Sequence, residues 1–318
     1  MGYTSGAKTL YEILDEICAG LLSSTGGNWT DGDTTWNTSD KSIANNGRRC
    51  MLFQKNGEVT YWAIEVVNET SGAYFYYNYY GKGLRFTASK TWENHSYPVS
   101  NVQSFCPFEI HGGGVGTNMA TLQVTYYLWI DPDGNGFAIL MKPEPTGSNT
   151  QNSMFLVLER SDLKEYSDGQ SSFYLLNIGN VWQGIIYSTY DVGYPNIRLW
   201  RTILRPWAYQ YPDGTATRIT CYPNGNGVSM VANPSYYAFK STQNSKVYYV
   251  KPIIHNAANQ LAPIFQAELW FPWSEGVGLV DGDVIAIEGS SSKFLCKSVD
   301  SPDSTNRLCY AIKYENVV

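Results

Sequence analysis

The sequence predicts a mainly β protein whose antiparallel sheets pack in a sandwich-like arrangement, with one N-terminal amphipathic helix packed on a β-meander. Segments rich in β-branched and aromatic residues, with period-two alternation, recur along the chain between turn-forming residues. Only one stretch, near the start, places its apolar residues at helical spacing. No internal repeat of about 20–50 residues is present, which argues against a propeller or a solenoid.

The predicted helix spans Thr9–Leu22. Thr9 and Glu12 fit a capping box, in which each side chain satisfies a free backbone donor at the helix start. We expect Gly26-Gly27 to end the helix. Its apolar stripe must cover a sheet or a neighbouring subunit, so its residues are interface candidates: Leu10, Ile13, Leu14 and Ile17.

Period-two patterning follows a polar loop. The strands expected first are Arg49–Gln54, Val59–Asn68 and Ala73–Tyr80. Asn56-Gly57 joins the first two, because this dipeptide suits the positive φ angles of a tight hairpin turn. One face of the second strand is apolar and should be buried; it consists of Trp62, Ile64 and Val66.

The middle of the chain continues as a succession of strands. They are Thr121–Ile130, Phe137–Met141, Met154–Arg160, Phe173–Ile178, Ile185–Tyr190, Ile197–Leu204 and Ala216–Tyr222. Gly112–Gly116 is the best candidate for a boundary between a docking module of residues 1–111, formed by the helix and its meander, and a β-rich domain of residues 117–318. One continuous domain is the alternative.

Residues 246–289 are expected to form an aromatic three-strand unit. Its strands are Val247–Ile254, Ile264–Phe271, which Pro272 stops, and Val284–Glu288, which follows the tight turn Asp281–Asp283. Strands Phe294–Ser298 and Arg307–Tyr314 close the chain. Nothing in this unit resembles catalytic chemistry, and we interpret it as a framework that carries aromatic surface.

The composition favours contact surfaces over nucleic-acid or membrane binding. Charged residues make up 16% of the 318 residues, against about a quarter in ordinary globular proteins, whereas aromatic residues reach 15% with 25 Tyr and 10 Trp. The net charge of −6 argues against a binder of nucleic-acid phosphates. The sequence contains no apolar run of about 18 residues, so we expect no membrane span. Its first residues lack the pattern of a signal peptide. Cys296 and Cys309 could lie on paired strands, but reduced, buried thiols are favoured for all six widely spaced cysteines.

Several motifs resemble chemical sites, and each has a simpler interpretation. Asp131–Gly136 matches the opening of a calcium loop, but Lys142 replaces the glutamate at its twelfth position, so a hairpin turn is favoured over a metal site. His111–Gly114 is similar to the oxyanion segment of some lipases, yet the chain lacks the G-x-S-x-G elbow, so a linker is favoured. We expect no cofactor and no metal.

Acidic and aromatic residues supply the remaining candidates. The nearest to a glycosidase carboxylate pair are Glu65, Glu268, Asp281 and Asp283, although each fits a solvated strand face or a turn more simply. The aromatic residues expected at the surface are Trp270, Trp273, Tyr236 and Tyr237. Such rings either stack on sugars or anchor contacts between subunits.

The order of several stretches resembles that of virion structural proteins of tailed bacteriophages, from the tail, neck or baseplate region. The stretches are Tyr3–Gly6 leading into the helix and Trp29, then Glu58–Glu65, Tyr74–Tyr80, Tyr249–His255, Ala267–Trp270, Gly282–Glu288 and Asn306–Tyr314. Residues 90–245 match this family poorly, and the family carries no catalytic residues over to this chain.

The resemblance implies a non-enzymatic virion component, made in the host cytoplasm, that forms a homo-oligomeric ring or collar. Its partners would be other copies of itself and neighbouring virion proteins. The alternative is a carbohydrate- or receptor-binding β module of the phage tail, with a host surface glycan as partner. A polysaccharide-degrading enzyme is the third hypothesis and the least favoured.

Overall fold

The computed structural model describes residues 2–42, 47–68, 80–93, 102–111, 118–144, 153–160, 173–180, 199–204, 219–222, 238–249, 251–256, 263–273, 278–300 and 307–316. Over these residues the chain is mainly β, with antiparallel sheets and two α-helices. None of the helices in the described ranges is long and apolar enough to span a membrane.

Three sheets form the body of the molecule. The central sheet has the strand order β1 (Tyr3–Thr9), β7 (Gln123–Ile130), β8 (Gly136–Pro143), β9 (Met154–Arg160), β10 (Phe173–Asn180) and β11 (Leu199–Leu204). The meander sheet consists of β2 (Trp29–Asp31), β3 (Arg48–Lys55), β4 (Glu58–Asn68), β5 (Tyr80–Ser89) and β6 (Val102–His111). The C-terminal sheet has the order β17 (Trp270–Pro272), β20 (Arg307–Asn316), β19 (Ser292–Asp300) and β18 (Val284–Ala286).

Short elements complete the described structure. One small sheet holds β12 (Ile219–Tyr222), β15 (Ile253–Asn256) and β16 (Pro263–Gln266), and a hairpin pairs β13 (Ala238–Lys240) with β14 (Val247–Tyr249). The helices are α1 (Leu10–Leu22), α2 (Thr34–Thr38) and a 3-10 turn, η1 (Asp40–Ser42).

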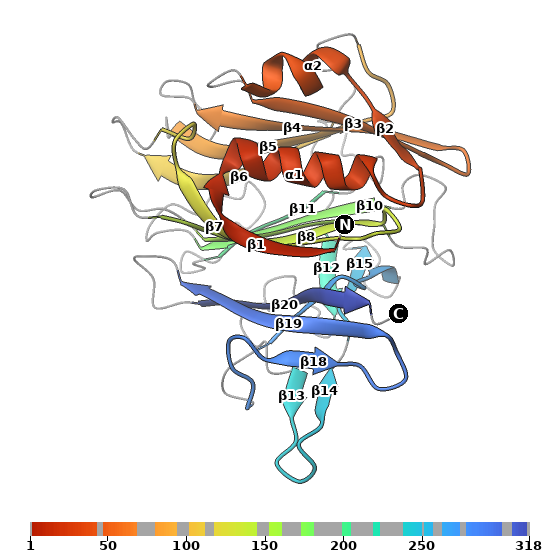
Figure 1. The fold of residues 1–318 in the computed structure, drawn as a ribbon, viewed down its shortest axis with the longest axis vertical. Helices are drawn as coiled ribbons and strands as arrows, with labels where there is room; N and C mark the ends of the chain where they lie inside the picture. Colours follow the sequence, from red (N-terminus) through yellow and green to blue (C-terminus); the bar gives the residue numbers. More distant parts are fainter. Residues whose placement is uncertain are drawn as a thin grey trace.

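The sheets stack as layers, with the central sheet between the other two (Figure 1). One hydrophobic core joins its upper face to α1 and the meander sheet. A second core joins its lower face to the C-terminal sheet, and a third lies between that sheet and the β13–β14 hairpin. Because both faces of the central sheet are covered, β8 and β9 are buried at nearly every position instead of every second one.

The N-terminal helix lies between the central and meander sheets, which confirms that it packs on the meander (Figure 1). The capping box is also confirmed, because the Thr9 side chain accepts from the Glu12 backbone and the Glu12 side chain accepts from the Thr9 backbone. The predicted span is confirmed at its end, Leu22, but Gly26-Gly27 does not cap the helix, because Ser23 takes that position. Gly26 instead allows close approach to the β7–β8 turn, where an added Cβ would overlap the carbonyl oxygen of Asp133.

The first hairpin of the meander follows the prediction. Asn56 and Gly57 have φ angles of 51° and 83° and connect β3 to β4. The predicted apolar face of β4 is fully buried; it consists of Trp62, Ile64 and Val66. Of the predicted strand Ala73–Tyr80 only Tyr80 lies in the described residues, and Ile185–Tyr190 and Gly112–Gly116 lie outside them.

The predicted three-strand unit of residues 246–289 is wrong. Val247–Ile254 divides into β14 and β15, and Ile264–Phe271 divides between β16 and β17, with each half in a different sheet. Pro252 explains the first break because it has no backbone N–H for a sheet ladder, while its carbonyl accepts from Ala267. The strands β1, β2, β6 and β13 and the helix α2 were not predicted, and neither was β5 beyond its first residue, Tyr80.

Contacts cross the predicted boundary between residues 1–111 and 117–318. The strand β1 pairs along its whole length with β7, and the side chains of α1 share one core with both sheets. In the described residues, the two predicted segments therefore contribute to one hydrophobic core.

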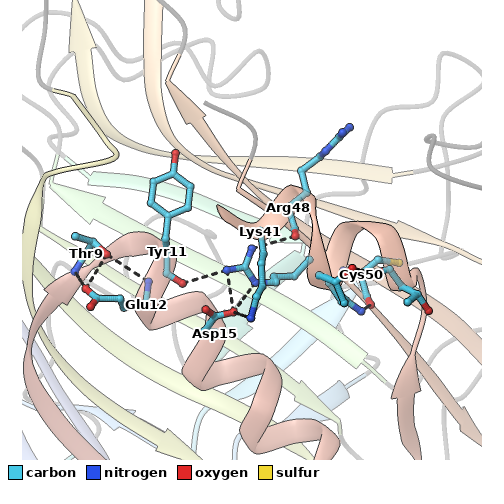
Figure 2. A network of polar contacts seen from close by, with 11 residues as sticks. Thr9, Tyr11, Glu12, Asp15, Lys41, Arg48 and Cys50 are labelled. Carbon is cyan, nitrogen blue, oxygen red and sulfur yellow. Dashed lines mark hydrogen bonds and ion pairs between the residues drawn. The ribbon is translucent and has the colours of Figure 1, made fainter. Parts of the chain in front are cut away.

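A buried arginine on β3 fixes α1 to the meander sheet, and Figure 2 labels the two helix residues that it contacts, Tyr11 and Asp15. The Arg49 side chain is only 2% exposed. Its guanidinium donates to the Asp15 carboxylate at 2.9 Å and to the Tyr11 carbonyl oxygen at 3.3 Å. A buried guanidinium needs this charge and these acceptors, so the contact sets where the helix lies on the sheet.

A buried carboxylate joins the central sheet to the C-terminal sheet. Glu159, at the end of β9, is 1% exposed. Its Oε1 atom accepts from the backbone N–H groups of Glu268 and Leu269, at 2.6 and 3.0 Å, just before β17 begins. The carboxylate thereby satisfies two amides at the interface between the layers.

Replacing this carboxylate should weaken the contact between the central sheet and the C-terminal sheet. We expect Glu159→Ala to lower the free energy of unfolding by at least about 2 kcal/mol, because two amides lose a charged acceptor. The matched control is Glu315→Ala, which removes an exposed glutamate paired with Lys293 and should cost less than about 1 kcal/mol. Urea unfolding of both variants measures the difference, and equal losses would contradict the role given to Glu159.

Candidate functional site

Most of the predicted interface residues lie in the interior of the chain. Leu10, Ile13, Leu14 and Ile17 are 0–1% exposed between the central and meander sheets. The exposure expected for Trp270 and Trp273 is wrong, because these residues are 1% and 0% exposed. A partner could touch any of the six only if the layers separated. Tyr236 and Tyr237 lie outside the described residues.

The two tryptophans are held by their own chain. The Trp270 ring lies 5.3 Å from Phe155 and 5.8 Å from Tyr310, between the central and C-terminal sheets. Trp273 belongs to the core on the other face of the C-terminal sheet. Neither ring presents a face on which a sugar could stack.

The predicted acidic candidates take part in strand and turn contacts. Glu65 pairs with Arg85 at 3.7 Å, and Glu268 pairs with Lys251. Asp281 pairs with Lys297 at 2.8 Å, and the Asp283 carboxylate accepts from the Val280 backbone at 3.0 Å. These contacts agree with the interpretation favoured from the sequence, in which each carboxylate belongs to a strand face or a turn.

The calcium-like segment forms the turn between β7 and β8, which confirms the favoured interpretation. Asp131 accepts from the backbone and side-chain nitrogens of Asn135, at 3.2 and 2.8 Å. Trp29 donates to the carbonyl of Gly134 at 2.7 Å and so docks the turn on the meander sheet. In the part of the chain that the structure describes, no cluster of three or more His, Cys, Asp or Glu could hold a metal ion.

The feature that stands out is the outer edge of β1, at the border of the central sheet. The backbone N–H of Ile130 donates to the Gly2 carbonyl oxygen at 3.1 Å. In the register of the β1–β7 pair, the hydrogen-bonded positions of β1 are therefore its even-numbered residues. Because such positions alternate in antiparallel pairs, the backbone groups of Tyr3, Ser5 and Ala7 point away from β7. Residues 5–7 are exposed. In the described structure, this row of donors and acceptors faces outward without a neighbouring strand.

This edge lacks the usual protection of exposed strands. Natural edges are kept short or carry proline, bulges or free charges that prevent pairing with another chain. The strand β1 has seven residues, contains no proline and pairs with β7 without a register shift. Its single charge, Lys8, is engaged by Glu16 at 2.9 Å. By contrast, β2, β17 and β18 have three residues each.

Contacts on both faces hold β1 in place. On the helix side, the Glu16 carboxylate accepts from the Tyr126 hydroxyl at 2.7 Å and from Lys8 at 2.9 Å. On the opposite side, the Tyr3 and Tyr314 rings meet edge to face at 4.8 Å. The edge is therefore preorganised for a strand that pairs with it, which reduces the entropy lost on association.

Sequence reasoning missed β1 as a strand. Its segment, YTSGAKT, has too few apolar residues for alternation to stand out. The available signal was negative: neither proline nor an acidic residue interrupts the segment before the helix cap at Thr9. The resemblance to virion proteins includes Tyr3–Gly6, but it assigned the stretch no structure.

The contacts of Glu16 make the anchoring of β1 sensitive to pH. Burial by itself would raise the pKa of the Glu16 carboxyl, but hydrogen bonds from Tyr126, Lys8 and Thr4 outweigh it, so the pKa lies below its ordinary value of 4.5. A lowered pKa in the folded state gives stability that is present above the ordinary pKa and is lost as the pH falls through the folded value.

We therefore expect Glu16→Gln to lower the free energy of unfolding near pH 7 and to have a diminishing effect below pH 4.5. Urea unfolding from pH 7 down to pH 3 measures this difference. In a Tyr126→Phe background the effect of Glu16→Gln should shrink, because one donor to the carboxylate is gone. A loss that is the same at every pH would contradict the linkage.

Comparisons with known proteins add no relative on which to rest a function. No protein-family model, no curated protein and no solved structure matches this chain. The residues and contacts of the chain itself are therefore the basis for its proposed function.

Proposed function

We propose that this chain is a non-enzymatic structural component of a tailed-phage virion, in the tail, neck or baseplate region, and that it works through protein–protein contacts in a homo-oligomer. The observation that carries this proposal is the open edge of β1. A virion subunit must bind its neighbours repeatedly and in fixed orientation, and an exposed strand edge provides directional hydrogen bonds for that purpose.

The position of the edge in the fold supports this role. The strand β1 borders the central sheet, whose two faces are both covered by other layers. A contact made there is transmitted to a sheet that is packed on both faces instead of to a loop. The order of stretches that resembles that of tailed-phage virion proteins, beginning at Tyr3–Gly6, supports the same class of protein.

The proposal predicts an oligomer that depends on the outward N–H of Ser5. We expect the wild-type chain to form oligomers in solution, and Ser5→Pro to weaken the association at least about tenfold, because it removes one outward donor per subunit. Proline is tolerated at this position because the Ser5 N–H takes no part in the pairing with β7. Multi-angle light scattering over a range of concentrations measures the association.

Ser5→Ala is the matched control, because it removes the hydroxyl but keeps the backbone N–H, and it should assemble like the wild type. A wild-type chain that stays monomeric at high concentration would overturn the proposal. Imaging of purified phage particles tests separately whether the chain is part of the virion. Particles whose density lacks this fold would exclude a virion role.

A further inference from the structure

We infer that β1 pairs with β1 of a second copy of this chain, antiparallel and centred on Ser5, so that the two central sheets become one continuous sheet. This inference rests on the proposed function and specifies its first contact. A two-fold axis relates the copies, so the same surface is used twice and the contact closes.

The outward groups of β1 complement themselves in this register. Each of Tyr3, Ser5 and Ala7 offers one N–H and one C=O. Antiparallel pairing centred on Ser5 places Tyr3 opposite Ala7 of the partner subunit, and Ser5 opposite Ser5 of the partner subunit. All three positions are then hydrogen-bonded pairs that exchange both bonds, so no outward group of these residues remains unused.

The capping box excludes the next register. Thr9 also has the parity of an outward residue, but its N–H donates to Glu12 at 2.8 Å. A register centred on Gly6 would place Tyr3 opposite Thr9 of the partner subunit, and the Tyr3 carbonyl would find that donor occupied. A register centred on Thr4 would pair Tyr3 with Ser5 of the partner subunit and leave Ala7 beyond these pairs. Centring on Ser5 uses the largest number of free groups.

Side chains and charge fit the same register. The large Tyr3 ring faces a small residue, Ala7 of the partner subunit. Thr4 faces Gly6 of the partner subunit at a position where the backbones approach most closely, about 4.5 Å between Cα atoms. Lys8 faces Gly2 of the partner subunit, so the one charge of the strand does not meet its equivalent, and each lysine keeps its own Glu16.

Engineered cysteines test the register. In this pairing the two Ser5 Cα atoms lie about 5.5 Å apart, within the range of a disulfide, so Ser5→Cys should give a covalent dimer under mild oxidation. The two Ala7 Cα atoms lie roughly 14 Å apart, because they are offset by four residues, so Ala7→Cys should crosslink at least about tenfold less. The wild-type chain, treated alike, measures crosslinking by its native cysteines; Cys18, Cys50 and Cys296 are buried.

Hydrogen exchange of the wild-type chain provides a test without substitutions. The amides of Tyr3, Ser5 and Ala7 should become protected as concentration rises, whereas the amide of the exposed Gly282, already bonded to Cys296, should not change. If Ala7→Cys crosslinks as well as Ser5→Cys, this inference falls and the proposed function stands. If the wild type assembles but these amides stay unprotected, this inference falls together with the role that the proposed function gives to the edge of β1. If the wild type does not assemble, both fall.

Discussion

The structure depends on one constraint, which is that the central sheet is covered on both faces. Its upper face packs on α1 and the meander sheet, and its lower face packs on the C-terminal sheet. A sheet in this position cannot present a polar face to water, so β8 and β9 carry near-continuous apolar runs. What remains accessible to a partner in this sheet is its border, so a partner can reach the sheet at the edge of β1 and not on a face.

The polar groups that enter this interior hold the layers in register. Arg49 fixes α1 to the meander sheet through Asp15, and Glu159 binds the two amides that lead into β17. Trp29 fixes the β7–β8 turn through the Gly134 carbonyl. Apolar packing alone tolerates sliding of one layer over another, whereas these contacts require their donors and acceptors at fixed positions. An edge used for assembly gains from this rigidity.

Local patterns accounted for much of the first half and less of the second. The capping box at Thr9, the Asn56-Gly57 turn and the buried face of β4 each depend on residues within one hairpin or one helical turn, so the sequence indicates them directly. The split of Val247–Ile254 between two sheets could not be predicted in this way, because a β-branched run has the same propensity in either sheet. The burial of Trp270 and Trp273 also depends on packing between layers whose strands are distant in the sequence.

The sequence by itself determined the class of the fold, the start of the helix and the absence of a conspicuous catalytic motif, because these follow from periodicity and from residue types at short spacing. Only the tertiary structure decided which aromatic residues remain at the surface and which strand ends a sheet. Whether β1 is an edge depends on β7, more than a hundred residues away, pairing with one side of it and on nothing described pairing with the other. Hydrogen-bond partners so distant leave no signature in the seven residues of β1, and this is why its open edge became visible only in the folded chain.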